Sequence, residues 1–213
     1  MDFIPALPVL ATFSVACIVL AITPGPDMSL FLSRAISQGK GAGLAAMAGT
    51  LTGVVVHTAM VALGLSALVV AAPAAFNALK FAGAGYLAWL AFDAIRNGSS
   101  LNLKGGKGRQ QSLKTNFLTG IGVNLLNPKI ILFFMTFLPQ FVAAGDPHAI
   151  GKFFFLGLMF NVISLPIIVP MILAADSMAE FLKRKPLVTR VIDWVFAGVF
   201  SAFAVRILMT PAR

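Results

Sequence analysis

The chain has little charge. Only 11% of its 213 residues are charged, whereas 59% are hydrophobic. Soluble domains carry about 25% charged and roughly 45–50% apolar residues. So few charges cannot cover the surface of a soluble protein of this size, and apolar runs of about 18 residues or more are typical of helices that cross a bilayer. The composition therefore predicts an integral membrane protein surrounded by membrane lipid.

Cysteine and histidine are also scarce. Cys17 is the only cysteine, and there are two histidines. One thiol excludes an internal disulfide, a CxxC redox pair and a cysteine metal site. So few ligands also argue against a metal centre or a metal exporter, because such sites need clustered His, Asp or Cys side chains. We expect no cofactor and no bound metal.

Several catalytic motifs are missing from the sequence. It has no Walker A loop, no HExxH and no Gly-x-Ser-x-Gly. The first absence argues against direct use of ATP, and the other two remove the usual nucleophile and base of a membrane hydrolase. We therefore expect that the protein is not an enzyme.

The net charge of +9 has two interpretations. A basic chain can bind nucleic acid, but here the cations lie in short loops between apolar runs. That placement is typical of the positive-inside rule for membrane proteins. We expect no nucleic-acid partner.

Six apolar runs divide the chain, and most are close to the roughly 20 residues that a spanning helix needs. They cover residues 3–33, 44–71, 76–95, 115–142, 153–175 and 191–209. No second soluble domain is present, so residues 1–213 form one transmembrane domain. The predicted fold is an all-α integral membrane protein with six transmembrane helices. Asp193 lies near the start of the last run and is expected at the membrane interface.

Two of the runs carry a break. Residues 23–27 (TPGPD) interrupt the first run and residues 127–129 (NPK) interrupt the fourth. Pro24 and Pro128 each lie in the first span of a three-span half, so the second half must have the opposite topology. This predicts two inverted repeats, 1–96 and 114–213, joined by a cytoplasmic loop at 97–113. Paired broken helices mark the binding site in transporters built on this plan.

Lys and Arg side chains predict the orientation. Eleven of the sixteen lie in the first, third and fifth loops, which share one side of the membrane. The positive-inside rule makes that side cytoplasmic and places both termini outside. If the break at 23–27 were instead the tip of a re-entrant segment, five spans would remain and the N-terminus would be inside.

The two breaks share a local design. Thr23 and Asn127 are favoured N-cap residues, and Pro24 and Pro128 would then occupy the first helical position, where proline is preferred. We therefore expect a helix to restart at each break.

Each proline also frees a backbone carbonyl four residues before it. The freed groups are the carbonyls of Leu20, Ile22 and Asn124. Because unpaired backbone is costly in lipid, these carbonyls must face protein, water or a bound solute.

The breaks differ in charge preference. The N–H groups of Lys129 and Ile130 would be available to an anion beside the Lys129 ammonium, whereas the first break offers freed carbonyls and Asp27, which suit a cation. A zwitterion such as an amino acid needs both. The predicted binding residues are Thr23, Pro24, Gly25, Pro26, Asp27, Asn124, Asn127, Pro128 and Lys129, with Asp27 and His57 as candidates for proton coupling.

Structural interpretations of the same residues are open. Asp27 and Lys129 can simply pair with each other, or Lys129 can extend toward the interface. His57 can be a packing residue, and Asn124 and Asn161 can merely bridge helices. Gly49 and Gly53 form a small-xxx-small pair that predicts close helix packing.

The two breaks, their spacing, the segment 34–43 and the phenylalanines after residue 132 together resemble the LysE/RhtB family of amino-acid exporters. The resemblance covers nearly the whole chain. It implies a bacterial inner-membrane protein that exports amino acids or related compounds using an ion gradient, with residues 24–26 and 127–129 as motif positions. Family members often carry Asn or Asp at the position of Asp27.

We therefore predict a proton-coupled exporter of small amino acids that works by alternating access. The alternatives are an exporter or facilitator of another small solute, and a membrane subunit or enzyme without transport activity. The oligomeric state is open, with a homodimer as one option.

Overall fold

The computed structural model describes residues 4–65, 110–143 and 146–209, together with 81, 84–85, 88–89, 91–92 and 95–96. Within these residues the chain is helical and forms no strand. All-α architecture is thus confirmed for the described part of the chain. The loop predicted at 97–113 lies outside it, except for its last four residues.

Both predicted interruptions are present. The first run forms α1 (Leu7–Ile22) and α2 (Pro26–Gln38), which meet at an angle of 49°. The fourth run forms α6 (Leu113–Leu125) and a second helical segment, bent from it by 55°. That second segment consists of α7 (Pro128–Leu132), the π-helical η2 (Phe133–Phe137) and the 3-10 helix η3 (Leu138–Phe141).

Two helices are continuous and apolar enough to cross a membrane. They are Lys40–Gly64, made of α3 (Lys40–Met60) and most of η1 (Val61–Leu65), and α8 (Ala149–Leu173). Counting each bent pair as one span raises the number to four within the described residues. The apolar helices thus agree with a multi-pass membrane protein.

The third and sixth runs are not established as spans. Residues 76–95 lie largely outside the described part of the chain, although the described positions among them are helical. The sixth run is covered by α10 (Pro186–Met209), which is not among the candidate spans. The arrangement of six helices in two repeats therefore stays a prediction.

Residues 176–190, the predicted fifth loop between the runs 153–175 and 191–209, are helical except for Lys185. They form α9 (Ala175–Arg184) and the first turn of α10. Two features favour helix here: Arg184 pairs with Glu180 one turn earlier at 2.5 Å, and Pro186 occupies the first position of α10, where proline is tolerated. The charged composition of this segment does not predict a loop, because a charged segment at the end of a span can still form a surface helix.

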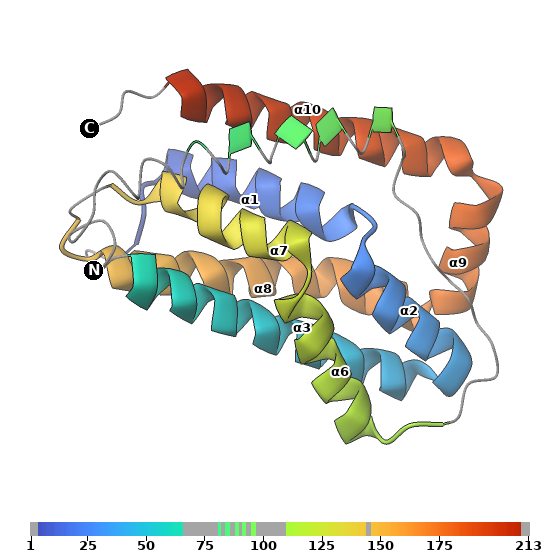
Figure 1. The fold of residues 1–213 in the computed structure, drawn as a ribbon. Helices are drawn as coiled ribbons and strands as arrows, with labels where there is room; N and C mark the ends of the chain where they lie inside the picture. The colour runs from blue at the N-terminus through green and yellow to red at the C-terminus, as the bar shows by residue number, and fades with distance from the viewer. Residues whose placement is uncertain are drawn as a thin grey trace.

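The described helices run back and forth between two ends of the molecule (Figure 1). The start of α1, the end of α3, the start of α8 and the end of α10 lie at one end. The end of α2, the starts of α3 and α6, and α9 lie at the other. The reversal from α2 to α3 takes one residue, Gly39, whose positive φ of 93° favours glycine. Both bends lie between these ends, where the two broken helices approach each other.

Two apolar clusters lie around the breaks. The larger is rich in phenylalanine, with Phe133 and Phe137 only 4.8 Å apart between ring centres, and it packs α1 against η2 and α8. The smaller joins α2 to α3 and α8 through residues such as Phe31 and Ile172. The polar residues of the breaks are therefore held between two tightly packed regions.

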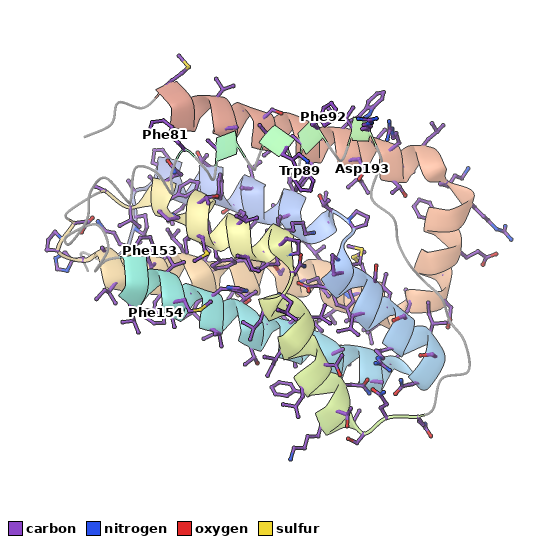
Figure 2. All side chains as sticks on the ribbon, viewed as in Figure 1. Phe81, Trp89, Phe92, Phe153, Phe154 and Asp193 are labelled. Atoms are coloured by element: carbon purple, nitrogen blue, oxygen red, sulfur yellow. The ribbon has the colours of Figure 1, made fainter. Side chains whose placement is uncertain are left out.

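Aromatic side chains also lie beside α10. Figure 2 shows Trp89 and Phe92 next to this helix, and both are exposed. Asp193, on α10, is only 1% exposed. Asp193 is therefore covered by its neighbours, and its position at the membrane interface stays a prediction.

Glycine sets the distance between α3 and α6. A methyl group at Gly49 would lie 1.9 Å from the Phe117 carbonyl oxygen, and one at Gly120 would lie 2.1 Å from the Ala46 carbonyl oxygen. The two backbones touch at these glycines. The predicted close packing at Gly49 is therefore confirmed.

The Gly49→Ala variant is expected to be destabilised by about 1–3 kcal/mol, because the added methyl group forces two backbones apart. The melting temperature in detergent should fall by about 2–4 °C per kcal/mol. Gly122→Ala, on α6, is the matched control, since a methyl group there meets nothing within 4 Å. Equal melting temperatures for the two variants would contradict this packing.

Candidate functional site

The first break ends α1 and starts α2 later than predicted. Thr23 is the C-cap of α1, and its hydroxyl donates to the Val19 carbonyl at 2.6 Å. Gly25 is the N-cap of α2, and Pro26 is its first residue. The assignment of Thr23 as N-cap and Pro24 as first helical residue is wrong. A residue before proline avoids the helical region, so Pro26 holds Gly25 extended and delays the start of the helix.

The second break agrees with its prediction. Asn127 is the N-cap and Pro128 the first residue of α7. The Lys129 N–H donates to Asn127 Oδ1 at 3.1 Å, and the Ile130 N–H donates to the Asn127 carbonyl at 3.0 Å. The two N–H groups expected to bind an anion are thus already bonded to Asn127. An anion at this break would have to meet side chains instead.

Two of the three freed carbonyls, those of Leu20 and Asn124, accept from a side chain elsewhere in the fold. The Leu20 carbonyl, freed by Pro24, accepts from Lys129 Nζ at 3.4 Å. The Asn124 carbonyl, freed by Pro128, accepts from His57 Nε2 at 3.3 Å. The same Lys129 ammonium also donates to the Thr23 carbonyl at 2.9 Å. The cationic side chain of the second break therefore lies in the first.

Asp27 is bonded across the breaks by an amide. Asn124 Nδ2, near the end of α6, donates to Asp27 Oδ2 at 2.7 Å. A methyl group at Gly53 would lie 2.5 Å from Asn124 Oδ1, so glycine makes room for this amide. Asp27 and Lys129 are not joined within 4.0 Å among the ion pairs of described residues. They share a site without forming the simple pair that was one alternative.

His57 lies behind this network. It is 2% exposed and stacks on Phe134, with ring centres 6.0 Å apart. Since the Asn124 carbonyl can only accept, Nε2 carries the hydrogen, and Nδ1 is buried with no hydrogen-bond partner among the described residues. The structure links His57 to Asp27 through one residue, Asn124.

Asn161 follows His57 by 104 residues, the same separation as that of Pro24 and Pro128. Its Nδ2 donates to the Leu51 carbonyl at 3.2 Å, joining α8 to α3. His57, by contrast, contacts a broken helix. The two positions are therefore different in their contacts, and Asn161 acts as a bridge between helices.

A small cavity lies between the breaks, with a volume of about 40 Å³. This is room for a few water molecules, because roughly 10–15 Å³ of such space holds one. Its polar lining includes Thr23, Asp27, Asn124 and Lys129. Sequence reasoning missed the remaining lining residues, because an apolar pattern does not say which side chains face a cavity. They are Leu20, Ala21, Met28, Phe31, Thr50, Leu51, Val54, Ile130, Phe160 and Ile168.

Three buried polar atoms of the site have no hydrogen-bond partner among the described residues. Asp27 Oδ1 and Asn124 Oδ1 are acceptors, and Asn127 Nδ2 is a donor. Buried polar groups are nearly always paired. Together with the ammonium of Lys129, they give the site both acceptors and donors, which suit a solute that carries positive and negative groups.

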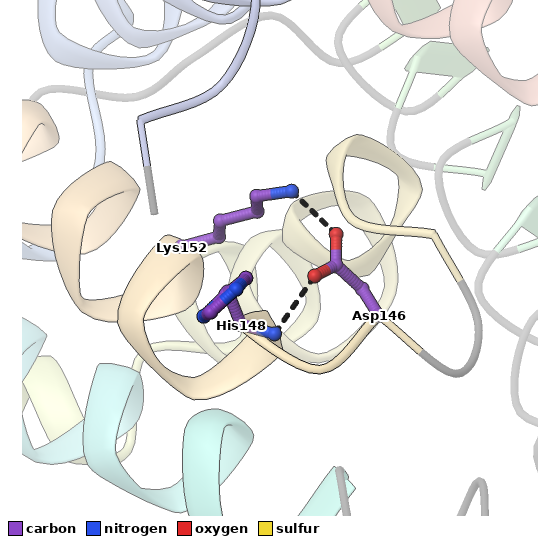
Figure 3. A network of polar contacts seen from close by, with 3 residues as sticks. All are labelled: Asp146, His148 and Lys152. Carbon is purple, nitrogen blue, oxygen red and sulfur yellow. Dashed lines mark hydrogen bonds and ion pairs between the residues drawn. The ribbon is translucent and has the colours of Figure 1, made fainter. Parts of the chain in front are cut away.

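Other charged groups lie away from the site. Asp146, in the turn before α8, accepts from Lys152 Nζ and from the His148 N–H (Figure 3). These bonds, that from Lys152 first, hold the pKa of Asp146 below its ordinary value. The carboxylate therefore stays charged at physiological pH and fastens this turn to α8. Within the described residues, no group of three His, Cys, Asp or Glu side chains is placed to hold a metal.

An apolar helical protein with paired broken helices around part-buried charged groups has the architecture of a membrane transporter. The particular family follows from comparison with known proteins. The chain belongs to the LysE type translocator family, whose model matches residues 18–210. It is therefore a membrane transport protein and not an enzyme.

Its relatives include exporters of known name. The chain is 29% identical over 195 residues to the homoserine/homoserine lactone efflux protein of Salmonella typhimurium, covering 92% of each chain. It is 25% identical over 198 residues to the leucine efflux protein of Salmonella choleraesuis, again covering 92% of each chain. No solved structure matches the chain.

Proposed function

We propose that the protein is a secondary-active exporter of small amino acids or their derivatives across the bacterial inner membrane. The observation that carries this proposal is the meeting of Asp27, Lys129 and Asn124 at one buried cavity between two broken helices. Buried ionisable side chains in a membrane are costly and mark substrate or ion pathways. The names of the two relatives support amino acids as the substrate class.

The substrate would bind with its charged ends on opposite partners. Its ammonium group would meet Asp27 Oδ1 and Asn124 Oδ1, which are acceptors without partners. Its carboxylate would meet Lys129 and Asn127 Nδ2, the donors. Apolar cavity residues such as Phe160 and Ile168 would contact the side chain. The polar contacts of the substrate would thus lie at the two breaks. Thr23, Pro24, Gly25, Pro26 and Pro128 would shape the backbone around them.

The size of the cavity supports alternating access. A volume of about 40 Å³ is too small for homoserine or leucine. The substrate must therefore enter a more open state, and the bends of 49° and 55° are natural hinges for that change. A proton arriving at Asp27 or His57 from outside would weaken the hold on the substrate ammonium and favour its release.

The proposed topology has six spans in two inverted repeats, with both termini outside. The described cations support it: Lys40, Lys114 and Arg190 belong to elements that begin at the same end of the molecule. The test fuses to the C-terminus a reporter that works only outside the cytoplasm. We expect this fusion to show reporter activity. Activity of a cytoplasm-specific reporter at the same position would exclude this orientation.

Export itself is testable with a substrate panel. Cells that express the protein are expected to accumulate at least one neutral amino acid in the medium and to resist a toxic analogue of it. The control is the same cells with an empty vector, and amino acids in the medium are measured by chromatography. An unchanged medium across the panel, with the protein present in the membrane, would contradict the proposed function.

A further inference from the structure

The ammonium group of Lys129 lies in a cation site that is formed by backbone carbonyls of the other break. It donates to the Leu20 and Thr23 carbonyls, at 3.4 and 2.9 Å, although it belongs to the opposite break. Two backbone carbonyls beside a carboxylate form a site of the kind that binds an ammonium group. We call the Leu20 and Thr23 carbonyls and Asp27 the ammonium cradle.

Glycine at position 25 makes the cradle accessible to Lys129. A methyl group there would lie 3.0 Å from Lys129 Nζ and 3.2 Å from its Cε. The φ of Gly25 is −173°, an extended value that any residue adopts. Gly25 is therefore needed for the room it leaves, not for its backbone conformation.

We propose that Lys129 fills the ammonium cradle in the substrate-free protein, and that the substrate's own ammonium group takes its place there. Lys129, once displaced, then turns to the other end of the substrate. The proposal rests on the proposed function and defines its substrate class, namely compounds with a primary ammonium group.

The exchange keeps the buried charges balanced. If Lys129 left the cradle with nothing to replace it, the Leu20 and Thr23 carbonyls would lose their side-chain donor beside Asp27 Oδ1, which has none already. Unpaired buried polar groups are costly. An arriving ammonium group supplies the same N–H donors and the same charge. A carboxylate without an amine offers Lys129 a partner but leaves the cradle empty, so it is a poor ligand. An amine without a carboxylate still satisfies the cradle.

The test uses purified protein and does not depend on transport. Lys129→Ala empties the cradle, so methylammonium is expected to raise the melting temperature of this variant by about 2–4 °C when it is about fivefold above its dissociation constant. The wild type should need at least about tenfold more, because the tethered lysine competes at a high effective concentration. Tetramethylammonium has the same charge but no N–H donors, and it should have no effect on either protein.

Two further variants make the result specific. Adding Asp27→Asn to Lys129→Ala is expected to abolish the methylammonium shift, because the carboxylate of the cradle is lost. Gly25→Ala retains the lysine but crowds its ammonium, so it should also respond to methylammonium more strongly than the wild type. This variant carries the test if Lys129→Ala does not fold.

The outcomes separate this proposal from the proposed function. Folded Lys129→Ala that shows no shift, or a shift equal to that of the wild type, would overturn the cradle. A selective shift in a protein that exports no amino acid would keep the cradle and reject export. Competition between a substrate, its amide and its deaminated acid then checks the class: the amide should bind and the acid should not.

Discussion

Lys129→Ala and Asp27→Asn are each expected to lower export by at least about 30-fold at equal protein levels. Removing one member of a buried, hydrogen-bonded set of charges costs about 2–5 kcal/mol, which corresponds to that factor or more. In Lys129→Ala the Leu20 and Thr23 carbonyls lose their side-chain donor. In Asp27→Asn the amide of Asn124 loses a charged acceptor. The measurement is the initial rate of efflux from loaded vesicles or cells.

The chain provides its own matched control. Asp146 and Lys152 form a second Asp–Lys contact outside the cavity. Asp146→Asn and Lys152→Ala make the same chemical changes and are expected to leave export near the wild-type rate. Wild-type rates for both Asp27→Asn and Lys129→Ala would reject the charged site. Equal losses in all four variants would trace the effect to general stability.

The breaks were predictable because proline acts locally. A proline removes one hydrogen bond and frees one carbonyl wherever it stands in a helix, so the positions of both bends follow from the sequence. Asn127 as N-cap followed from the same local rule. The first break was harder, because two prolines compete to start the helix, and the second of them determines where α2 begins.

The partners of the freed groups were not predictable, because they depend on how distant helices pack. Nothing in residues 127–129 says that the lysine crosses to the Leu20 and Thr23 carbonyls, or that His57 contacts the Asn124 carbonyl. Those contacts require α3 and α6 to touch at Gly49 and Gly120. The small-residue pattern indicated close packing on α3 but did not identify the facing helix.

The freed carbonyls of the two breaks also have different partners. In the first break the Leu20 carbonyl receives a lysine, and in the second the Asn124 carbonyl receives a histidine. A carbonyl freed by proline therefore accepts from two different kinds of side-chain donor. The lysine lines the cavity, where a substrate can displace it, whereas the histidine lies behind Asn124 against Phe134. This difference is the basis for the proposal that Lys129 acts in binding and for the expectation that His57 acts in coupling.

His57→Gln is expected to uncouple export from the proton gradient while retaining binding. The glutamine amide can donate to the Asn124 carbonyl as Nε2 does now, so exchange of substrate across the membrane without a gradient should stay within about threefold of the wild type. Glutamine cannot take up a proton. With one proton per substrate, a gradient of about one pH unit supports roughly tenfold accumulation, and this should fall to unity in the variant.

His57→Phe distinguishes the hydrogen bond from the proton. Phenylalanine maintains the packing on Phe134 but leaves the Asn124 carbonyl without a side-chain donor. Because Asn124 holds Asp27 through its amide, this variant is expected to lose exchange as well as accumulation. Both quantities are measured in vesicles with and without an imposed pH gradient. Wild-type accumulation by His57→Gln would remove His57 from the coupling path and leave Asp27 as the group that takes up the proton.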